Sequence, residues 1–154
     1  GAKSVLGLDI SDKAIALAKR NAAINGFDGV CDFQNLNAFD VLKQWSKEGK
    51  KFDTIILDPP PFTKSRHNIQ NAINGYKEIN LRAMKLLNTG GFLVTSSCTN
   101  LISAELFLET IGEAAKDAKK KIKQISFQTQ SADHPILWSV PEMQYLKFLI
   151  ISVE

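Results

Sequence analysis

Two short segments combine residue types that could carry out chemistry on a flat ring. In the first, Asp58 is followed by three prolines and Phe62, and in the second, Cys98 follows two serines. Prolines fix the backbone φ angle, so Pro59 and Pro60 would hold the Asp58 carboxylate in place without further ordering. A carboxylate can bind the polar edge of a nucleobase, and a thiolate is a good nucleophile toward an electron-poor ring carbon. Together, the two segments predict chemistry on a nucleobase.

Both segments also have structural explanations. Three prolines could simply end a strand, with Phe62 in the core instead of stacked on a base. We favour a binding loop, because an acid before three prolines is unusual in a segment that serves only to end a strand. A free cysteine is most often a small buried hydrophobe, so a role for Cys98 depends on its exposure and on the neighbouring loop. Cys31 lies inside a strand pattern and is predicted to be structural.

Polar residues elsewhere are weaker candidates. Asp9 follows the first predicted strand, where it could accept both hydroxyls of a ribose or merely begin a helix. Asn37 follows the second strand and could pair with an adenine edge, although a turn or cap is the favoured explanation. Lys64 and Arg66 could contact phosphates or lie in a solvated loop. His134 could shape a pocket or move a proton, and a structural turn explains it at least equally well.

The apolar pattern places these candidates at the ends of strands. The predicted strands cover residues 4–8, 30–36, 53–57, 92–95, 122–128 and 145–153, and the predicted helices cover residues 12–24, 39–45, 69–86 and 104–118. A turn at 88–91 is expected after the longest helix, and the near-continuously apolar strand 53–57 is typical of a central parallel strand. The alternation predicts an α/β fold with a doubly wound, mostly parallel sheet and an antiparallel last strand. Such sheets bind ligands at the carboxyl ends of their strands.

The composition excludes several classes of protein. The chain has 154 residues, enough for one domain with a core, and no apolar run approaches the roughly 18 residues that span a bilayer. The net charge of +3 permits an RNA partner without demanding one. Its two cysteines are too few for a disulfide framework and lack metal-binding spacing. We therefore expect a reduced cytoplasmic protein that binds neither a metal nor a membrane.

The motifs occur in the same order in class I S-adenosylmethionine-dependent RNA methyltransferases. The matching positions are Asp9, 37–39, 58–60, 75–80, 97–98 and 132–135. The chain is most similar, over essentially all of its 154 residues, to bacterial large-subunit ribosomal RNA cytosine 5-methyltransferases that carry a PUA domain. The resemblance implies a Rossmann-like sheet, S-adenosylmethionine as cofactor and ribosomal RNA as partner.

The resemblance also implies roles for individual residues. Cys98 would be the nucleophile, and Asp58 would lie between the methyl donor and the base. The residues that would bind the cofactor are Asp9, Ile10, Asn37, Ala38 and Asp58. Binding of the RNA falls to Pro59, Pro60, Phe62, Lys64, Arg66 and His134. Asn37 stands where the family often has an acid, which keeps a polar partner for adenine but could alter the affinity for the donor.

The implied mechanism follows from the chemistry of cytosine. Carbon 5 is a poor nucleophile until the Cys98 thiolate adds to carbon 6, after which carbon 5 can attack the donor's methyl group. Loss of the carbon 5 proton and of the thiolate then restores the ring, although no residue is assigned to remove that proton. Asp58, protonated or bridged to the N3 edge, would stabilise the adduct. The target base must be flipped out to reach the thiol.

One departure from the family is large. The glycine-rich loop that wraps the amino-acid end of the donor is absent, since no Gly-x-Gly pattern occurs. The strand before that loop normally occupies the sheet centre, so its loss would leave the first and third strands without their shared neighbour. We therefore expect residues 1–154 to be an N-terminally incomplete methyltransferase domain, a C-terminal fragment that binds the donor weakly or not at all and does not methylate RNA alone. The exposed gap predicts self-association as a homodimer or a rearranged strand pairing.

Three other functions remain open. Uracil 5-methyltransferases also use a cysteine, but they usually follow it with Asn-Pro, whereas Thr99-Asn100 follows here. Exocyclic-amine methyltransferases use an acid or Asn before Pro-Pro-aromatic and need no thiol, and Phe62 lies one place later than that pattern. A non-catalytic RNA-binding fragment is the alternative of a different class.

Overall fold

The computed structural model describes residues 1–63 and 65–154, which divide into two compact units at residues 1–45 and 46–154. Each unit has its own strands, and each is described by itself. Within the described residues, no helix is long and apolar enough to cross a membrane.

The first unit is a two-stranded parallel sheet with one helix. Strand β1 (Val5–Asp9) pairs with β2 (Cys31–Asn35), and α1 (Asp12–Ile24) connects them. The predicted cap is confirmed, because the Ser11 hydroxyl accepts a hydrogen bond from the Ala14 amide at 3.3 Å. A second helix, α2 (Ala38–Glu48), begins in this unit and ends in the next.

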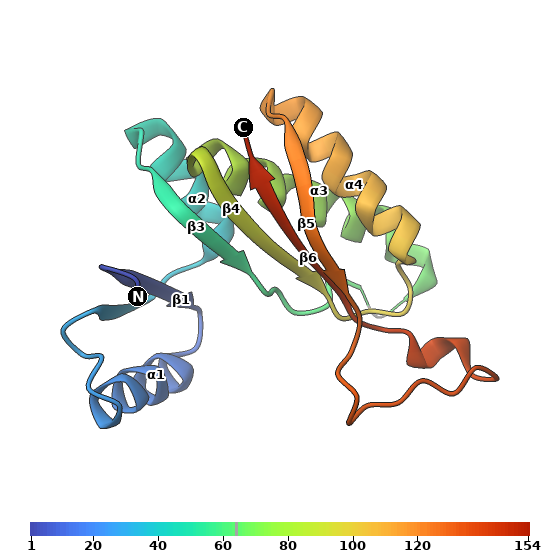
Figure 1. The fold of residues 1–154 in the computed structure, drawn as a ribbon, viewed down its shortest axis with the longest axis horizontal. Coiled ribbons are helices and arrows are strands. Elements are labelled where there is room, and N and C mark those ends of the chain that lie inside the picture. Colours follow the sequence, from blue (N-terminus) through green and yellow to red (C-terminus); the bar gives the residue numbers. More distant parts are fainter. Residues whose placement is uncertain (64) are drawn as a thin grey trace. The chain divides into compact units, whose positions relative to one another are not determined.

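The second unit is built on a four-stranded sheet in the order β3-β4-β6-β5. Its strands are β3 (Phe52–Leu57), β4 (Leu87–Ser97), β5 (Ile122–Gln128) and β6 (Lys147–Val153). Strands β3 and β4 are parallel, and β6 is antiparallel to both β4 and β5. The predicted antiparallel last strand is therefore confirmed. Because β3, β4 and β5 run the same way, the segment from β5 to β6 starts at the edge where β3 and β4 end (Figure 1).

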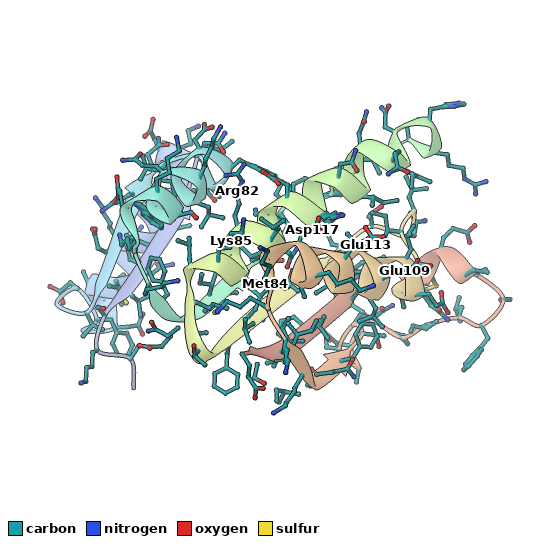
Figure 2. All side chains as sticks on the ribbon, turned by 90° about the horizontal axis from the view of Figure 1, so that it is seen from above. Arg82, Met84, Lys85, Glu109, Glu113 and Asp117 are labelled. Carbon is teal, nitrogen blue, oxygen red and sulfur yellow. The ribbon has the colours of Figure 1, made fainter. Side chains whose placement is uncertain are left out.

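Helices α3 (Ile69–Leu86) and α4 (Ala104–Ala118) lie side by side on one face of this sheet (Figure 1). Their inward side chains include Tyr76 and Phe107, which are almost fully buried and meet edge-to-face at 5.7 Å. On the outside, Lys77 of α3 pairs with Glu113 and Asp117 of α4 at 3.0 Å each. Figure 2 shows these two acids spaced along α4. Helix α3 starts and finishes at the first and last of the apolar positions that predicted it, and α4 begins after the predicted cap, Ser103.

The start of β4 differs from the prediction. A turn at 88–91 was expected to precede the strand, but β4 begins at Leu87, directly after α3. Phe52 pairs with Leu87 and Thr54 with Phe92, so β4 absorbs the extra residues as an irregularity within the strand. Gly91 makes this possible, because a Cβ there would lie only 2.9 Å from the carbonyl oxygens of Asn88 and Asp53. The glycines shape a bulge rather than a turn between elements.

Strand β3 was expected to be central and lies instead at an edge of its sheet. Among the described residues its only strand partner is β4, and Ile56 is 70% exposed. Strands β1 and β3 belong to different sheets, which agrees with the expectation that they lack a shared neighbour. An apolar run therefore indicated the strand but not the number of its neighbours.

Candidate active site

The ends of β3 and β4 join the two segments that the sequence singled out. Leu57 pairs with Thr95, so Asp58 follows β3 beside the last residues of β4. The Ser96 hydroxyl donates a hydrogen bond to Asp58 Oδ1 at 2.6 Å. This bond fixes the acidic loop to β4 two residues before Cys98, and sequence reasoning had assigned no role to Ser96.

Cys98 is exposed, which is the condition that the sequence set for a chemical role. It opens the loop after β4 and faces an open hollow of about 440 Å³, within the usual size range of small-molecule sites. The lining residues are Pro61, Thr63, Cys98, Thr99, Asn100, Leu101, Glu142 and Tyr145. The hollow therefore joins the proline loop, the end of β4 and the segment before β6.

The proline loop presents other residues to this hollow than predicted. Pro61 and Thr63 line it, and the Thr63 hydroxyl donates to the Ser65 carbonyl oxygen at 2.7 Å, which shapes the loop. The Phe62 ring packs instead against Tyr76, with ring centroids 4.5 Å apart. Because a Cβ at Gly75 would lie 3.1 Å from Phe62 Cδ2, the glycine gives the ring room on α3. Phe62 thus anchors the loop to the helix.

Tyr76 lies beneath the same strand ends. Burial raises the pKa of Tyr76, and the Cys98 charge raises it further, while Ser97 and the Phe62 backbone oppose this shift. The phenol therefore stays neutral at physiological pH. It supports the loop and the end of β4 as part of the core.

Lys147 is a buried cation beside Cys98 that the sequence reasoning missed. Its residue is 3% exposed, and it pairs with Ser97 across β4 and β6. Burial lowers the pKa of Lys147 to about 8, and the Cys98 charge opposes this shift. The sequence did carry one indication of this burial. Residues alternate between the two faces of a strand, and Lys147 lies on the same face as the buried residues Leu149 and Ile151.

Apart from Asp58, the predicted donor-binding residues lie at the strand ends of the first unit. Asp9 Oδ1 accepts a hydrogen bond from the Ser11 amide at 2.8 Å, and the Leu36 amide bonds to the Asp9 carbonyl oxygen at 3.1 Å. Asn37 Oδ1 accepts from the Phe39 amide at 2.9 Å, so Asn37 does act as a helix cap. Ile10 is 73% exposed beside the acid. A carboxylate, an amide and an exposed apolar side chain fit the ribose and the base of a nucleoside.

Among the described residues, the other predicted RNA-binding residues do not line the hollow. Arg66 is exposed in a short 3-10 helix, Arg66–Asn68, and Lys64 lies outside the described residues. The His134 side chain is 60% exposed and lies 3.3 Å from the Asp133 carboxylate. A hydrogen bond from the Ser131 hydroxyl holds the pKa of Asp133 below its usual value, and a hydrogen bond from His134 contributes less. Pro59, Pro60 and His134 are not among the described lining residues.

Comparisons with known proteins agree with this picture. A family model described as a methyltransferase domain matches residues 1–146. Ribosomal RNA large subunit methyltransferase I of Alteromonas mediterranea is 42% identical over 154 residues, which are 99% of this chain and 39% of that protein. The protein of the same name from Tolumonas auensis is 42% identical over 152 residues, 98% of this chain and 38% of that one. The chain thus spans about two fifths of the length of these relatives.

Solved structures share the fold. A putative SAM-dependent methyltransferase from Streptococcus mutans has a TM-score of 0.85 at 21% identity, over 99% of this chain and 39% of that one. NSun6 from Pyrococcus horikoshii, solved with SFG, has a TM-score of 0.68 at 17% identity, over 97% of this chain and 41% of that one. The architecture is the α/β class I methyltransferase fold.

Proposed function

Because this chain belongs to the methyltransferase-domain family, we propose that it is the catalytic region of an enzyme that methylates carbon 5 of a cytosine in large-subunit ribosomal RNA. The observation that carries this proposal is the exposed Cys98 in one hollow with the proline loop. The names of the relatives support the RNA substrate, and the thiol supports the position on the ring. A ribosomal RNA substrate would place the enzyme in the cytoplasm.

In this proposal, Cys98 activates the base. Its thiolate forms a bond to carbon 6, and the electron pair displaced from the ring double bond makes carbon 5 nucleophilic. S-adenosylmethionine supplies the electrophilic methyl group that carbon 5 takes. When the carbon 5 proton leaves, its electron pair re-forms the double bond and the sulfur departs from carbon 6 as thiolate.

Asp58 holds the polar edge of the base. The hydrogen bond from Ser96 fixes one of its carboxylate oxygens, so the acid is positioned before the base arrives. In its protonated form, the Asp58 carboxyl group would donate a hydrogen bond to N3 and so stabilise the negative charge that develops on the ring during thiolate addition. A group that is already in position needs no reorientation when the substrate binds. The proline-rich loop after β3 would give Asp58 this advantage.

The hollow offers a seat for the flipped base. Tyr145 supplies an aromatic ring on which a base can stack, and Glu142 supplies a carboxylate that accepts from an exocyclic amine. Cytosine carries such an amine, whereas uracil carries an oxygen there, which favours cytosine. Lys64, Arg66 and His134 are proposed as further contacts to the RNA.

The methyl donor would bind at the strand ends of the first unit. Asp9 would accept the ribose hydroxyls, Ile10 and Ala38 would contact the adenine, and Asn37 would pair with its edge through the amide nitrogen. Titration calorimetry of the full-length protein with S-adenosylmethionine tests this assignment. Asp9→Ala is expected to weaken binding at least tenfold, whereas Asp28→Ala, an exposed acid of the same unit, should leave it unchanged. Equal binding by both variants would remove Asp9 from the site.

The chemistry is tested in the full-length protein with ribosomal RNA and labelled methyl donor. Cys98→Ala is expected to abolish methyl transfer, and Cys31→Ala to retain it. Nucleoside analysis of the product distinguishes 5-methylcytidine from 5-methyluridine. Transfer that survives Cys98→Ala would favour methylation of an exocyclic amine, and RNA binding without any transfer would favour a non-catalytic role.

A further inference from the structure

Lys147 is a buried cation to which the proposed chemistry assigns no task. Lysine is seldom fully buried unless it is paired, because removing an ammonium group from water is costly. The structure nevertheless leaves only 3% of Lys147 exposed, at the first residue of β6. Among the described residues, no carboxylate forms an ion pair with it.

The ammonium group connects two walls of the hollow. Lys147 Nζ donates one hydrogen bond to the Tyr145 carbonyl oxygen at 3.0 Å and a second to the Thr99 carbonyl oxygen. Both Thr99 and Tyr145 line the hollow that Cys98 faces. Lys147 also pairs through β6 with Ser97. Cys98 therefore lies between two residues, Ser97 and Thr99, that are each held by Lys147.

Among the described residues, the charged and titratable groups around Cys98 come from four parts of the chain, and the first is the Asp58 carboxylate, which Ser96 holds beside the end of β4. Tyr76 of α3 is neutral, as burial requires, and Glu142 and Tyr145 line the hollow on the side of the segment before β6. Lys147 is the cation that interacts with the Cys98 charge. A lysine beside a cysteine favours the thiolate, the form that reacts with an electrophilic carbon.

The geometry points to Lys147 as a positioning residue for Cys98. Its hydrogen bonds tie the loop after β4 to the start of β6, and its charge interacts with that of Cys98, so that the sulfur is held where the base binds. This inference rests on the proposed role of Cys98 as nucleophile. Lys147 is not among the residues that line the hollow, so it acts through Cys98 and the backbone without touching the base.

Alkylation by iodoacetamide, followed peptide by peptide in the folded full-length protein, tests this inference. Lys147→Met is expected to slow alkylation of Cys98 at pH 7 by about three- to tenfold, and Lys147→Arg, which keeps the charge, to retain most of the rate. Cys31, in the first unit, is the internal control and should react at the same rate in every variant. At pH 9.5, where Lys147 of the wild type is mostly neutral, the difference between wild type and Lys147→Met should disappear.

Two outcomes overturn the inference. One is an unchanged Cys98 rate in folded Lys147→Met, and the other is a slowing that persists at pH 9.5, which would indicate a structural role alone. If Lys147→Met does not fold, Lys147→Gln replaces it, because the amide keeps N–H donors at this position while lacking the charge. Alkylation is measured without methyl transfer. An unchanged alkylation rate would therefore overturn this inference alone, whereas methyl transfer by Cys98→Ala would overturn the proposed function.

Discussion

Ser96 donates a hydrogen bond of 2.6 Å to the carboxylate of Asp58, and this contact joins the two strand ends that carry the proposed site. The donor is on β4, and the acceptor is in the loop after β3. Each strand end by itself is ordinary in an α/β sheet. Their connection places a fixed acid beside the segment that presents Cys98.

Removing this hydrogen bond should affect both stability and activity. Ser96→Ala leaves the Asp58 carboxylate without its donor, and hydrogen bonds to charged groups contribute about 1.5 to 3 kcal/mol. We expect urea denaturation to show a loss near the lower value, since the pair is only partly buried. Methyl transfer by the full-length protein should fall by at least tenfold. Ser152→Ala, in β6 of the same sheet, is the control, and equal effects of both changes would argue against a special Ser96–Asp58 contact.

Replacing each of two helical glycines with alanine distinguishes the effect of helix propensity on stability from the effect of crowding Phe62 in the proline loop. Gly112 in α4 has no atom within 4 Å of an added Cβ, so Gly112→Ala should raise the free energy of unfolding by up to about 1 kcal/mol. At Gly75 in α3 the new Cβ would lie 3.1 Å from Phe62, so Gly75→Ala should lose that gain and displace the loop. Thermal unfolding and RNA methylation measure the two effects. Equal stabilisation by both alanines, with full activity, would show that Phe62 does not need this space.

The buried Lys147 predicts an unusual dependence of stability on pH. Its pKa is about 8 in the folded chain against 10.5 ordinarily, so between these values the unfolded state retains a proton that the folded state has released. The cost of the buried charge is thus complete below pH 8 and disappears as the pH rises toward 10.5. We expect the free energy of unfolding to increase by on the order of 1 kcal/mol from pH 7.5 to 9.5, relative to Lys147→Met, because solvent screening reduces the full effect of the shift. If the free energy of unfolding depended on pH in the same way in the wild type and in Lys147→Met, burial would not be lowering the pKa of Lys147.

Local patterns predicted much of the fold. The bounds of α3 and β5 and the caps at Ser11 and Ser103 agree with the structure, because periodicity and capping depend on nearby residues. The start of β4 was missed because it depends on the register with β3, a contact between distant parts of the chain.

The site was predicted in its chemistry more than in its geometry. Asp58 and Cys98 were identified from residue type and strand position, and the structure brings their segments together. Phe62 was expected at the base and packs on Tyr76, because the direction of a loop side chain is set by the helix beneath it. Lys147 was missed because polarity argued for exposure, whereas the alternation of β6 turns it inward.

The most direct test of the central claim is covalent capture of the base by Cys98. Ribosomal RNA carrying 5-fluorocytidine has no proton to lose from carbon 5, so the adduct with the thiol should persist in the presence of the methyl donor. Mass spectrometry of the full-length protein should then find the nucleotide on the peptide that contains Cys98, and Cys98→Ala should show no adduct. Active enzyme that forms no adduct, or an adduct on another residue, would contradict the account.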